Sequence, residues 1–246
     1  MKYIVLLTAL LLVACENDSH TTEKQLKATE VVMAKKSEQK DEETSTNYKA
    51  EIVPEKMTVQ EKKERFRQLI LPPVKRVFAD LQKQYKEVKA VIRTGKKLAR
   101  IERLKKEYKA SSDEDLLARL KPHPVSIVLA QAAMDSAWAT SRFFVQAKNI
   151  FGVWSFNKNE PRIAAGEKRG KKTIWLKKYE TIEDAVRDNY RVLARGAAFE
   201  KFRQLRLKSE NPFELVKGLD KYSEIGAKYG KELAAVISFN KFNKYD

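Results

Sequence analysis

The strongest constraint on the fold of this chain is one continuous apolar segment, Val125 to Ser141, which follows Pro122 and Pro124. Its length and composition predict a helix that is hydrophobic on nearly every side, and such a helix is stable in water only when other elements surround it. The sequence therefore predicts a globular fold built around one central helix. The chain has 246 residues, 43% of them hydrophobic, which is enough for one sizeable core.

Further helical patterns lie on both sides of this segment. Apolar residues three and four positions apart predict helices over 59–71 and 74–92, separated by a bend at Pro72-Pro73 because proline interrupts helical hydrogen bonding. Other predicted helices cover 96–108, 112–120, 181–196, 212–219 and 226–240. Between Phe151 and Tyr179, short alternating stretches punctuated by glycines predict a small β-hairpin. The predicted fold class is α+β and mostly α-helical.

The N-terminal segment has the features of an export signal. Lys2 precedes an apolar run to Ala14 that is shorter than the roughly 20 residues needed to cross a bilayer. The run ends in Leu12-Val13-Ala14-Cys15, which resembles the lipobox of bacterial lipoproteins, whose cysteine is lipidated and becomes the first mature residue. The resemblance implies a signal peptide over 1–14 and a lipid on Cys15. Because Glu16 rather than Asp follows, it also implies an outer-membrane location facing the periplasm.

Composition changes after the signal. Residues 15–60 are polar and lack a sustained helical pattern, which predicts a flexible tether, and residues 61–246 form the predicted domain, with an N-terminal helical part (61–120) and a core part (121–246). The whole chain carries a formal charge of +17, and the part from Glu61 carries +19. This excess favours an anionic partner such as nucleic acid, lipid headgroups or an acidic wall polymer. With one Cys and two His, neither an internal disulfide nor a Cys/His metal cluster is expected.

Asp135 is the only acidic residue of the central apolar segment. Helical spacing places Gln131, Asp135 and Trp138 on one face, so that a carboxyl group lies beside an indole. Burial and the negative end of the helix dipole would both raise the pKa of this carboxyl. A carboxylic acid that is still protonated near neutral pH is what general-acid cleavage of a glycosidic bond requires. The alternative is a structural Asp that pairs with Arg142 or caps a turn.

Several motifs resemble one known family. The stretch from Ala130 to Phe143, followed by Asn149-Ile150-Phe151-Gly152, looks like the signature of bacterial glucosaminidases of the Bax type, which are related to glycoside hydrolase family 73. Weaker similarities lie at 173–179, 199–203 and 222–229, and the resemblance extends from about residue 62 to residue 246. It implies a lysozyme-like fold with a small β-hairpin lobe over the cleft. It also implies a peptidoglycan hydrolase that works without a cofactor.

The resemblance also identifies one unusual residue. The family's catalytic acid is a Glu at the position of Asp135, and Asp withdraws the carboxyl by about 1.5 Å. Misplacement by about 1 Å can cost on the order of 100-fold in rate. Ala139 stands where the family usually has Gly, which would place an extra methyl group beside the cleft.

The remaining candidates are a second carboxylate and a sugar-binding surface. Glu160, Glu167 and Glu224 are available, and Glu167 ranks first because its lobe would fold over the cleft, with Glu224 next. Flat aromatic rings stack on sugars, and polar side chains orient them. The predicted substrate-binding residues are Gln131, Trp138, Phe151, Trp154, Phe156, Tyr222 and Tyr229. Core packing competes with this role for at least two of the aromatic residues, and His123 receives no role.

Three functional hypotheses follow. The first is a monomeric, lipid-anchored β-N-acetylglucosaminidase that cuts peptidoglycan glycan strands with Asp135 as its acid. The second is a peptidoglycan-binding lipoprotein that keeps the groove but has lost catalysis through the Glu-to-Asp difference. The third, nucleic-acid binding, has the charge in its favour but lacks a recognisable binding module, and the export signal argues against it.

Overall fold

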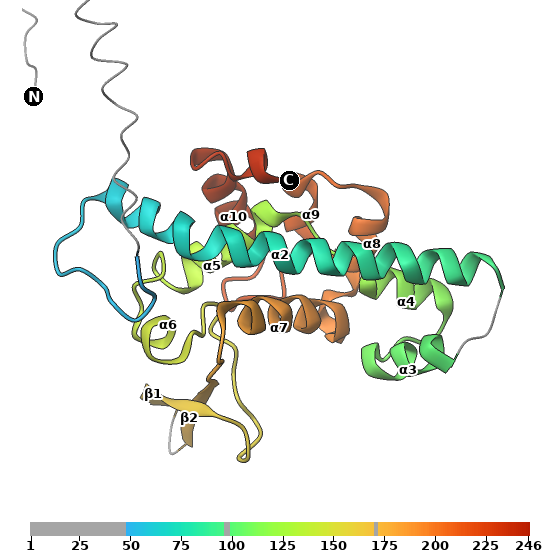
Figure 1. Cartoon of the computed structure of the whole chain (residues 1–246), viewed down its shortest axis with the longest axis horizontal. Coiled ribbons are helices and arrows are strands. Elements are labelled where there is room, and N and C mark those ends of the chain that lie inside the picture. Colours follow the sequence, from blue (N-terminus) through green and yellow to red (C-terminus); the bar gives the residue numbers. More distant parts are fainter. Residues whose placement is uncertain (1–47, 96–98, 170–171) are drawn as a thin grey trace, which may run out of the picture. The chain divides into compact units, whose positions relative to one another are not determined.

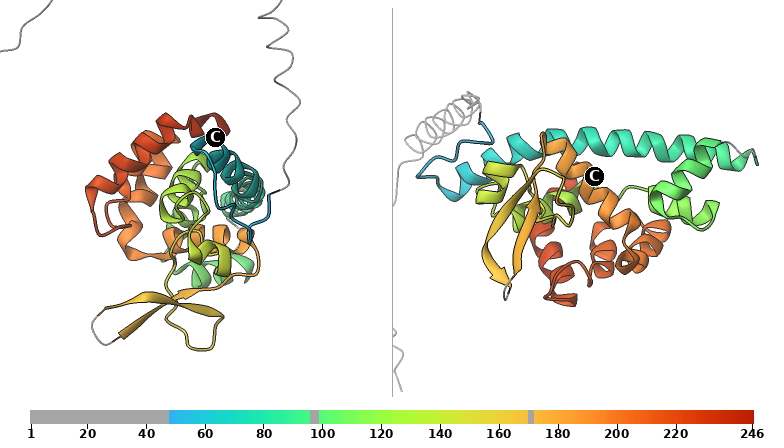
Figure 2. Two further views of the ribbon diagram at one scale, coloured as in Figure 1. Left: turned by 90° about the vertical axis from the view of Figure 1, so that its left-hand side faces the viewer. Right: turned by 90° about the horizontal axis from the view of Figure 1, so that it is seen from below.

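Helix α5 (Val125–Asp135) lies inside a body of helices, from which a two-stranded hairpin projects (Figures 1 and 2). The computed structural model describes residues 48–95, 99–169 and 172–246, and Tyr48 to Asp246 form one compact unit. None of the helices in these ranges has the length and apolarity of a membrane-spanning segment. The other helices and strands are α2 (Val59–Arg93), α3 (Ala99–Tyr108), α4 (Asp113–Leu120), α6 (Arg142–Ala147), β1 (Arg162–Arg169), β2 (Lys172–Lys177), α7 (Ile182–Arg195), α8 (Glu200–Lys208), α9 (Pro212–Leu215) and α10 (Ala227–Phe239), with short 3₁₀ turns η1 (Ala197–Phe199), η2 (Val216–Gly218) and η3 (Phe242–Tyr245).

The core surrounds α5 as its composition predicts. Every residue of α5 from Val125 to Ala133 is buried, and α2, α10 and η3 pack directly against the helix. A second, smaller apolar cluster joins the end of α2 to α3, α4 and α7 through Val88, Ile101, Leu104, Tyr108, Leu116, Leu120 and Ala194. The main cluster surrounds α5, the helix that ends at Asp135. The second cluster lies apart from it, where the end of α2 meets α3 and α4.

Helix α2 is one 35-residue helix, so the predicted break at Pro72-Pro73 was wrong. Two prolines inside a helix remove backbone donors and crowd the preceding turn. Tertiary packing outweighs this cost, because Phe66, Ile70 and Val74 on both sides of the prolines are fully buried in the main core. Pro73 is buried as well. A capping box between Thr58 and Glu61 begins the helix.

The folded part begins earlier than the predicted tether boundary at residue 60. Arg65, on the first turns of α2, is fully buried, and its guanidinium donates hydrogen bonds to the carbonyl groups of Lys49, Ala50 and Ile52. It also donates to the carbonyl of Ala139, beyond α5. Residues 48–52 therefore pack on the helical body. The sequence pattern does not show this, because the contacts are made by backbone carbonyls. Residues 1–47, including the predicted signal peptide, Cys15 and most of the tether, lie outside the described residues.

Replacing Arg65 with Met should lower the free energy of unfolding by about 3 kcal/mol or more, because buried carbonyls would lose their donors and each such loss costs about 1–3 kcal/mol. Urea denaturation of the purified protein measures this. Arg67→Met is the matched control. Arg67 pairs with Glu64 on the surface, and such pairs contribute at most about 1 kcal/mol. Equal losses in the two variants would contradict the structural role of Arg65.

The hairpin is antiparallel, with Arg162 opposite Lys177 and Ala164 opposite Trp175, and its register shifts between Ala164 and Lys168. Backbone hydrogen bonds connect the base of the hairpin to the helical body, such as that from the Tyr179 N–H to the Ala147 carbonyl. Helix α7 follows, begun by a capping box between Thr181 and Asp184. The predicted class, mostly α-helical with one small β-hairpin, is confirmed.

Candidate active site

Asp135 is the last residue of α5, and the chain leaves the right-handed helix immediately after it. Ser136 is the C-cap, and Ala137, Trp138 and Ala139 have φ values of 51°, 64° and 60°. The left-handed conformation costs L-residues roughly 1–2 kcal/mol each, so nothing in these residue types predicts it. The predicted continuation of the helix to Ser141 was therefore wrong.

Ser136 holds this left-handed turn in place. Its side chain is fully buried, and the Oγ donates a hydrogen bond to the Ala132 carbonyl (2.5 Å) while accepting one from the Ala139 N–H (2.7 Å). One hydroxyl thus satisfies a carbonyl of the last turn of α5 and an amide of the turn that follows. The two bonds fix the point at which Asp135 leaves the helix.

Ser136→Ala should destabilise the protein by about 1–3 kcal/mol, the cost of leaving the buried Ala139 N–H without its hydrogen-bond acceptor. The control is Thr140→Ala in the same turn, whose hydroxyl makes an exposed hydrogen bond to the Ala137 carbonyl (2.7 Å). We expect that control to stay within about 0.5 kcal/mol of the parent, as surface substitutions usually do. Thermal and urea unfolding measure both changes. A Ser136 variant as stable as the Thr140 variant would show that the turn is held by other contacts.

The left-handed turn also moves two predicted site residues. Trp138 does not continue the face of Gln131 and Asp135; its ring packs edge-on against Phe66 (5.2 Å between centroids) and lies 6.2 Å from Phe242. Ala139 is fully buried, and its carbonyl accepts a hydrogen bond from Arg65. The predicted helical face shared by Trp138 and Asp135 and the predicted position of Ala139 beside the cleft were therefore wrong. Ala139 belongs to the core, and Trp138 is partly buried and packs against it.

The Asp135 carboxyl lies in a largely buried environment, where it accepts a hydrogen bond from Tyr222. The Tyr222 hydroxyl donates to Asp135 Oδ2 at 3.1 Å. Burial raises the pKa of Asp135 to about 7, and the hydrogen bond from Tyr222 acts in the opposite direction. Burial and the nearby Asp135 charge also raise the pKa of Tyr222 well above its usual value. Tyr222 therefore remains a proton donor at any physiological pH, while Asp135 titrates near neutrality.

A second layer of polar side chains surrounds this pair. Asn189 of α7 lies with its Oδ1 3.4 Å from the Tyr222 hydroxyl, and its Nδ2 donates to Gln131 Oε1 at 3.3 Å. The rings of Tyr222 and Tyr229 stack, with centroids 5.0 Å apart. Within the described residues, Gln131 Nε2 and the Tyr229 hydroxyl have no hydrogen-bond partner. Gln131, Tyr222 and Tyr229 were predicted as site residues from the sequence, whereas Asn189 was not. The available signal was a polar residue on the otherwise apolar face of α7.

An open groove of about 550 Å³ reaches this network through Asn189 and Tyr222, which both line it. Trp154 and Phe156 stand on its wall with ring centroids 6.1 Å apart, and they are 42% and 85% exposed. The complete lining is Phe151, Gly152, Val153, Trp154, Phe156, Asn157, Glu160, Lys177, Asn189, Val192, Phe199 and Tyr222. The structure thus brings three of the predicted aromatic platforms, Phe151, Trp154 and Phe156, to one groove. Exposed rings at its wall can stack on the faces of sugars.

The candidates for a second carboxylate occupy different places. Glu160 lines the groove, and its Oε1 accepts a hydrogen bond from the Ser155 hydroxyl at 2.7 Å. Glu167 belongs to β1, but its side chain lies outside the described part of the structure. Glu224 is exposed in the loop before α10 and does not line the groove. The sequence alone could not determine which of these three glutamates lines the groove, because that depends on how the loop before β1 folds.

A carboxyl group that titrates near neutrality beneath an aromatic-lined groove can protonate a leaving oxygen of a bound sugar polymer. The fold and site are thus those of a glycosidase-like protein. A family model described as mannosyl-glycoprotein endo-beta-N-acetylglucosaminidase matches residues 113–242. The match covers more than half of the chain, and the chain belongs to this glucosaminidase family.

Solved structures to which this chain is similar include those of three bacterial proteins. The catalytic domain of the autolysin Auto from Listeria monocytogenes is 15% identical over 94% of this chain and 100% of that chain, with a TM-score of 0.46. A peptidoglycan hydrolase from Sphingomonas sp. A1 is 17% identical over 56% of this chain and 86% of its own, with a TM-score of 0.41. The glycoside hydrolase domain of FlgJ from Salmonella typhimurium is 20% identical over 56% and 88%, with a TM-score of 0.39. No curated protein matches the sequence.

Proposed function

We propose that this protein is a peptidoglycan hydrolase of the β-N-acetylglucosaminidase type, with Asp135 as the general acid. The observation that carries the proposal is the Asp135 carboxyl, which is largely buried, hydrogen-bonded by Tyr222 and joined through Tyr222 to the aromatic groove. Family membership supplies the bond class, since the matching model describes an endo-β-N-acetylglucosaminidase.

The acid step follows from the protonation states of the two side chains. Because burial raises the pKa of Asp135 to about 7, the carboxyl is still partly protonated near neutral pH. The protonated carboxyl gives its proton to the glycosidic oxygen as the bond to the sugar breaks. The Tyr222 hydroxyl, already placed at 3.1 Å, then donates its hydrogen bond to the carboxylate that remains.

The water that completes the reaction needs a base, or else assistance from the N-acetyl group of the sugar. We propose Glu160 for the first role, because its carboxylate lines the groove and the Ser155 hydroxyl orients it. Inverting enzymes place such a base about 6.5–9.5 Å from the acid. Substrate assistance would make this carboxylate dispensable.

Glu160→Gln should lower the rate of glycan cleavage by about 100-fold or more, the lower end of what a positioned base contributes. Glu224→Gln is the matched control, because Glu224 lies on the exposed loop outside the groove. Parallel assays with Glu167→Gln test the residue that the sequence ranked first. Full activity in Glu160→Gln together with loss in Glu167→Gln would assign the base to the hairpin strand.

The wall polymer is the proposed substrate because of the N-terminal segment and the charge. The lipobox-like residues before Cys15 imply attachment to the bacterial envelope, in which we propose a lipid-anchored monomer on the outer membrane facing the periplasm. The part of the chain from Glu61 carries +19, which suits a polymer whose peptides bear carboxylates.

The test is to incubate the purified protein and its Asp135→Asn variant with purified peptidoglycan, reduce the products with borohydride and identify them by mass spectrometry. Fragments ending in reduced N-acetylglucosamine from the parent, and none from Asp135→Asn, are expected. Asp220→Asn is the control, because Asp220 is near the surface and lies 3.9 Å from Lys201. Fragments that end in reduced N-acetylmuramic acid would show that the protein cleaves the other glycosidic bond of the glycan. Retention on peptidoglycan without any fragments would favour the non-catalytic binding protein.

A further inference from the structure

A second cavity lies on the opposite face of α7 from the groove. Asn189 and Val192 of α7 line the groove, whereas Tyr190, Arg191 and Ala194 line this cavity, and helical geometry places the two sets about 180° apart. The cavity has a volume of about 190 Å³. We call it the basic pocket; it is lined by Leu81, Gln84, Glu107, Tyr108, Arg119, Leu120, Lys121, Pro122, Arg187, Tyr190, Arg191, Ala194 and Arg206.

Positive charge dominates this lining, in which the single acidic residue is Glu107 and the cationic residues are Arg119, Lys121, Arg187, Arg191 and Arg206. The ion pairs at the rim are open to solvent. Arg187 contacts Asp80 at 2.8 Å with side chains 41% and 63% exposed, and Arg191 contacts Glu107 at 3.5 Å with side chains 43% and 46% exposed. Exposed pairs of this kind contribute at most about 1 kcal/mol, so either arginine can exchange its partner for a bound anion at little cost.

Arg206 is the buried cation of the pocket. It is 1% exposed, and its guanidinium donates to the Ala118 carbonyl at 3.0 Å and lies 3.5 Å from His123 Nδ1. Within the described residues Arg206 forms no ion pair, and its Nε has no hydrogen-bond partner. Burial lowers the pKa of Arg206 to about 9, because the charge has lost water without gaining a carboxylate.

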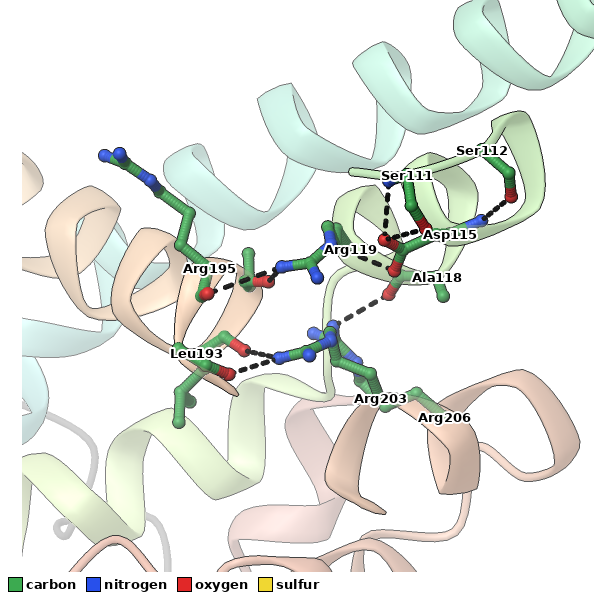
Figure 3. Close-up of polar contacts among 11 residues, drawn as sticks. Ser111, Ser112, Asp115, Ala118, Arg119, Leu193, Arg195, Arg203 and Arg206 are labelled. Atoms are coloured by element: carbon green, nitrogen blue, oxygen red, sulfur yellow. Dashed lines mark hydrogen bonds and ion pairs between the residues drawn. The ribbon is translucent and has the colours of Figure 1, made fainter. Parts of the chain in front are cut away.

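The neighbouring arginines also bind backbone carbonyls, as Figure 3 shows. Arg119 donates to the carbonyl groups of Ala194 and Arg195, and Arg203 donates to that of Leu193. These carbonyls belong to the last turn of α7, which carries only a partial negative charge. Among the described residues, Arg119 pairs with the Asp115 carboxylate, whereas Arg203 and Arg206 form no ion pair. The cluster therefore keeps an excess of positive charge beside the cavity.

The walls of the basic pocket indicate which anion fits. Leu81, Leu120 and Pro122 supply apolar surface next to the cations. A volume of about 190 Å³ exceeds that of one small oxyanion, given that a water in the liquid occupies about 30 Å³. Arginine forks match carboxylates geometrically, and apolar walls match a small side chain such as a methyl group. Leu81, Gln84, Glu107 and Tyr108 precede the residues that match the family model, so the pocket includes walls outside that match.

We propose that the basic pocket binds the terminal carboxylate of a short peptide with a small apolar side chain. In peptidoglycan, the stem peptides that branch from the glycan would supply such ends; this source rests on the proposed function. The pocket would then hold a peptide behind α7 while the groove engages a sugar chain. The carboxylate replaces the exposed partners of Arg187 and Arg191 and approaches the Arg206 guanidinium.

The experiment titrates the ¹⁵N-labelled, full-length Asp135→Asn protein at low salt with three probes, following the arginine Nε–Hε signals by NMR. The probes are N-acetyl-D-alanyl-D-alanine, its C-terminal amide and inorganic phosphate. We expect saturable shifts with the acid, at least tenfold weaker binding of the amide, and weaker binding of phosphate than of the acid. Arg187→Gln and Arg191→Gln should each weaken binding of the acid at least fivefold. Arg76→Gln, which removes an exposed arginine paired with Glu183 outside the pocket, should leave it unchanged.

Equal binding of acid and amide would overturn the proposal, as would unchanged binding in both the Arg187 and Arg191 variants. Binding of phosphate as tight as that of the acid would leave only a general anion site and would also overturn it. Both arginines are partly exposed at the rim, so their variants should fold as the parent does. The titration needs no cleavage, so it can show peptide binding even if the peptidoglycan assay yields no fragments. Conversely, cleavage of peptidoglycan without binding of the acid probe would overturn the pocket proposal and leave the proposed function intact.

Discussion

Replacing Asp135 with Glu is expected to raise the rate of glycan cleavage on the order of 100-fold above that of the parent protein. One extra methylene moves the carboxyl by about 1.5 Å beyond the end of α5. Misplacement of a catalytic group by about 1 Å costs on the order of 100-fold. Asp135 already touches Tyr222, a residue of the groove lining, so the longer side chain has a direct path towards bound substrate. Initial rates on peptidoglycan for the parent and the variant measure the effect.

The same assay run against pH tests the role of the proton. If Asp135 is the acid, the rate should fall about tenfold per pH unit above its pKa of about 7, because only the protonated carboxyl is active. Asp135→Asn should lose about 10²- to 10⁴-fold, the usual contribution of a general acid. A Glu variant no faster than the parent would show that side-chain length does not limit the rate. An Asn variant as active as the parent would remove Asp135 from the mechanism.

The fold was largely predictable because its dominant signals are local in sequence. The apolar run from Val125 identified the central helix, and the helical pattern over 112–120 identified α4. A break was predicted at the prolines of α2 because proline locally disfavours a helix. The burial of Phe66, Ile70 and Val74, which outweighs this local preference, arises only in the assembled core. Tertiary packing decided that outcome.

The site was predictable in part for the same reason. A lone carboxyl in an apolar helix identified Asp135, and three of the four aromatic residues proposed near it do line the groove. The left-handed turn at 137–139 could not be inferred, because the contacts that hold it come from the Ser136 hydroxyl and from Arg65, 74 positions away from Ala139. That turn, rather than the residue types, decides that Trp138 packs against the core.

The second large effect expected concerns stability, and it arises from the burial of Asp135. The folded state raises the pKa of this carboxyl from its ordinary value of 3.8 to about 7 and so holds the proton more tightly than the unfolded chain does. The contribution of protonated Asp135 is complete below pH 3.8, declines as the pH rises, and is lost once the pH has passed about 7. At 1.36 kcal/mol per pH unit, the decline amounts to about 4 kcal/mol.

The expected result is therefore a pH-dependent difference between the parent and Asp135→Asn, which does not titrate. Relative to the Asn variant, the parent should lose about 4 kcal/mol of unfolding free energy between pH 4 and pH 8, with little further change above pH 8. Urea denaturation of both proteins at several pH values isolates Asp135, because the other titrating groups are shared. In Tyr222→Phe the carboxyl loses the hydrogen bond that lowers its pKa, so the decline should extend to higher pH. A parent-to-Asn difference that stays constant from pH 4 to pH 8 would mean that Asp135 is solvated in the folded protein. The buried acid would then be unavailable to catalysis as well.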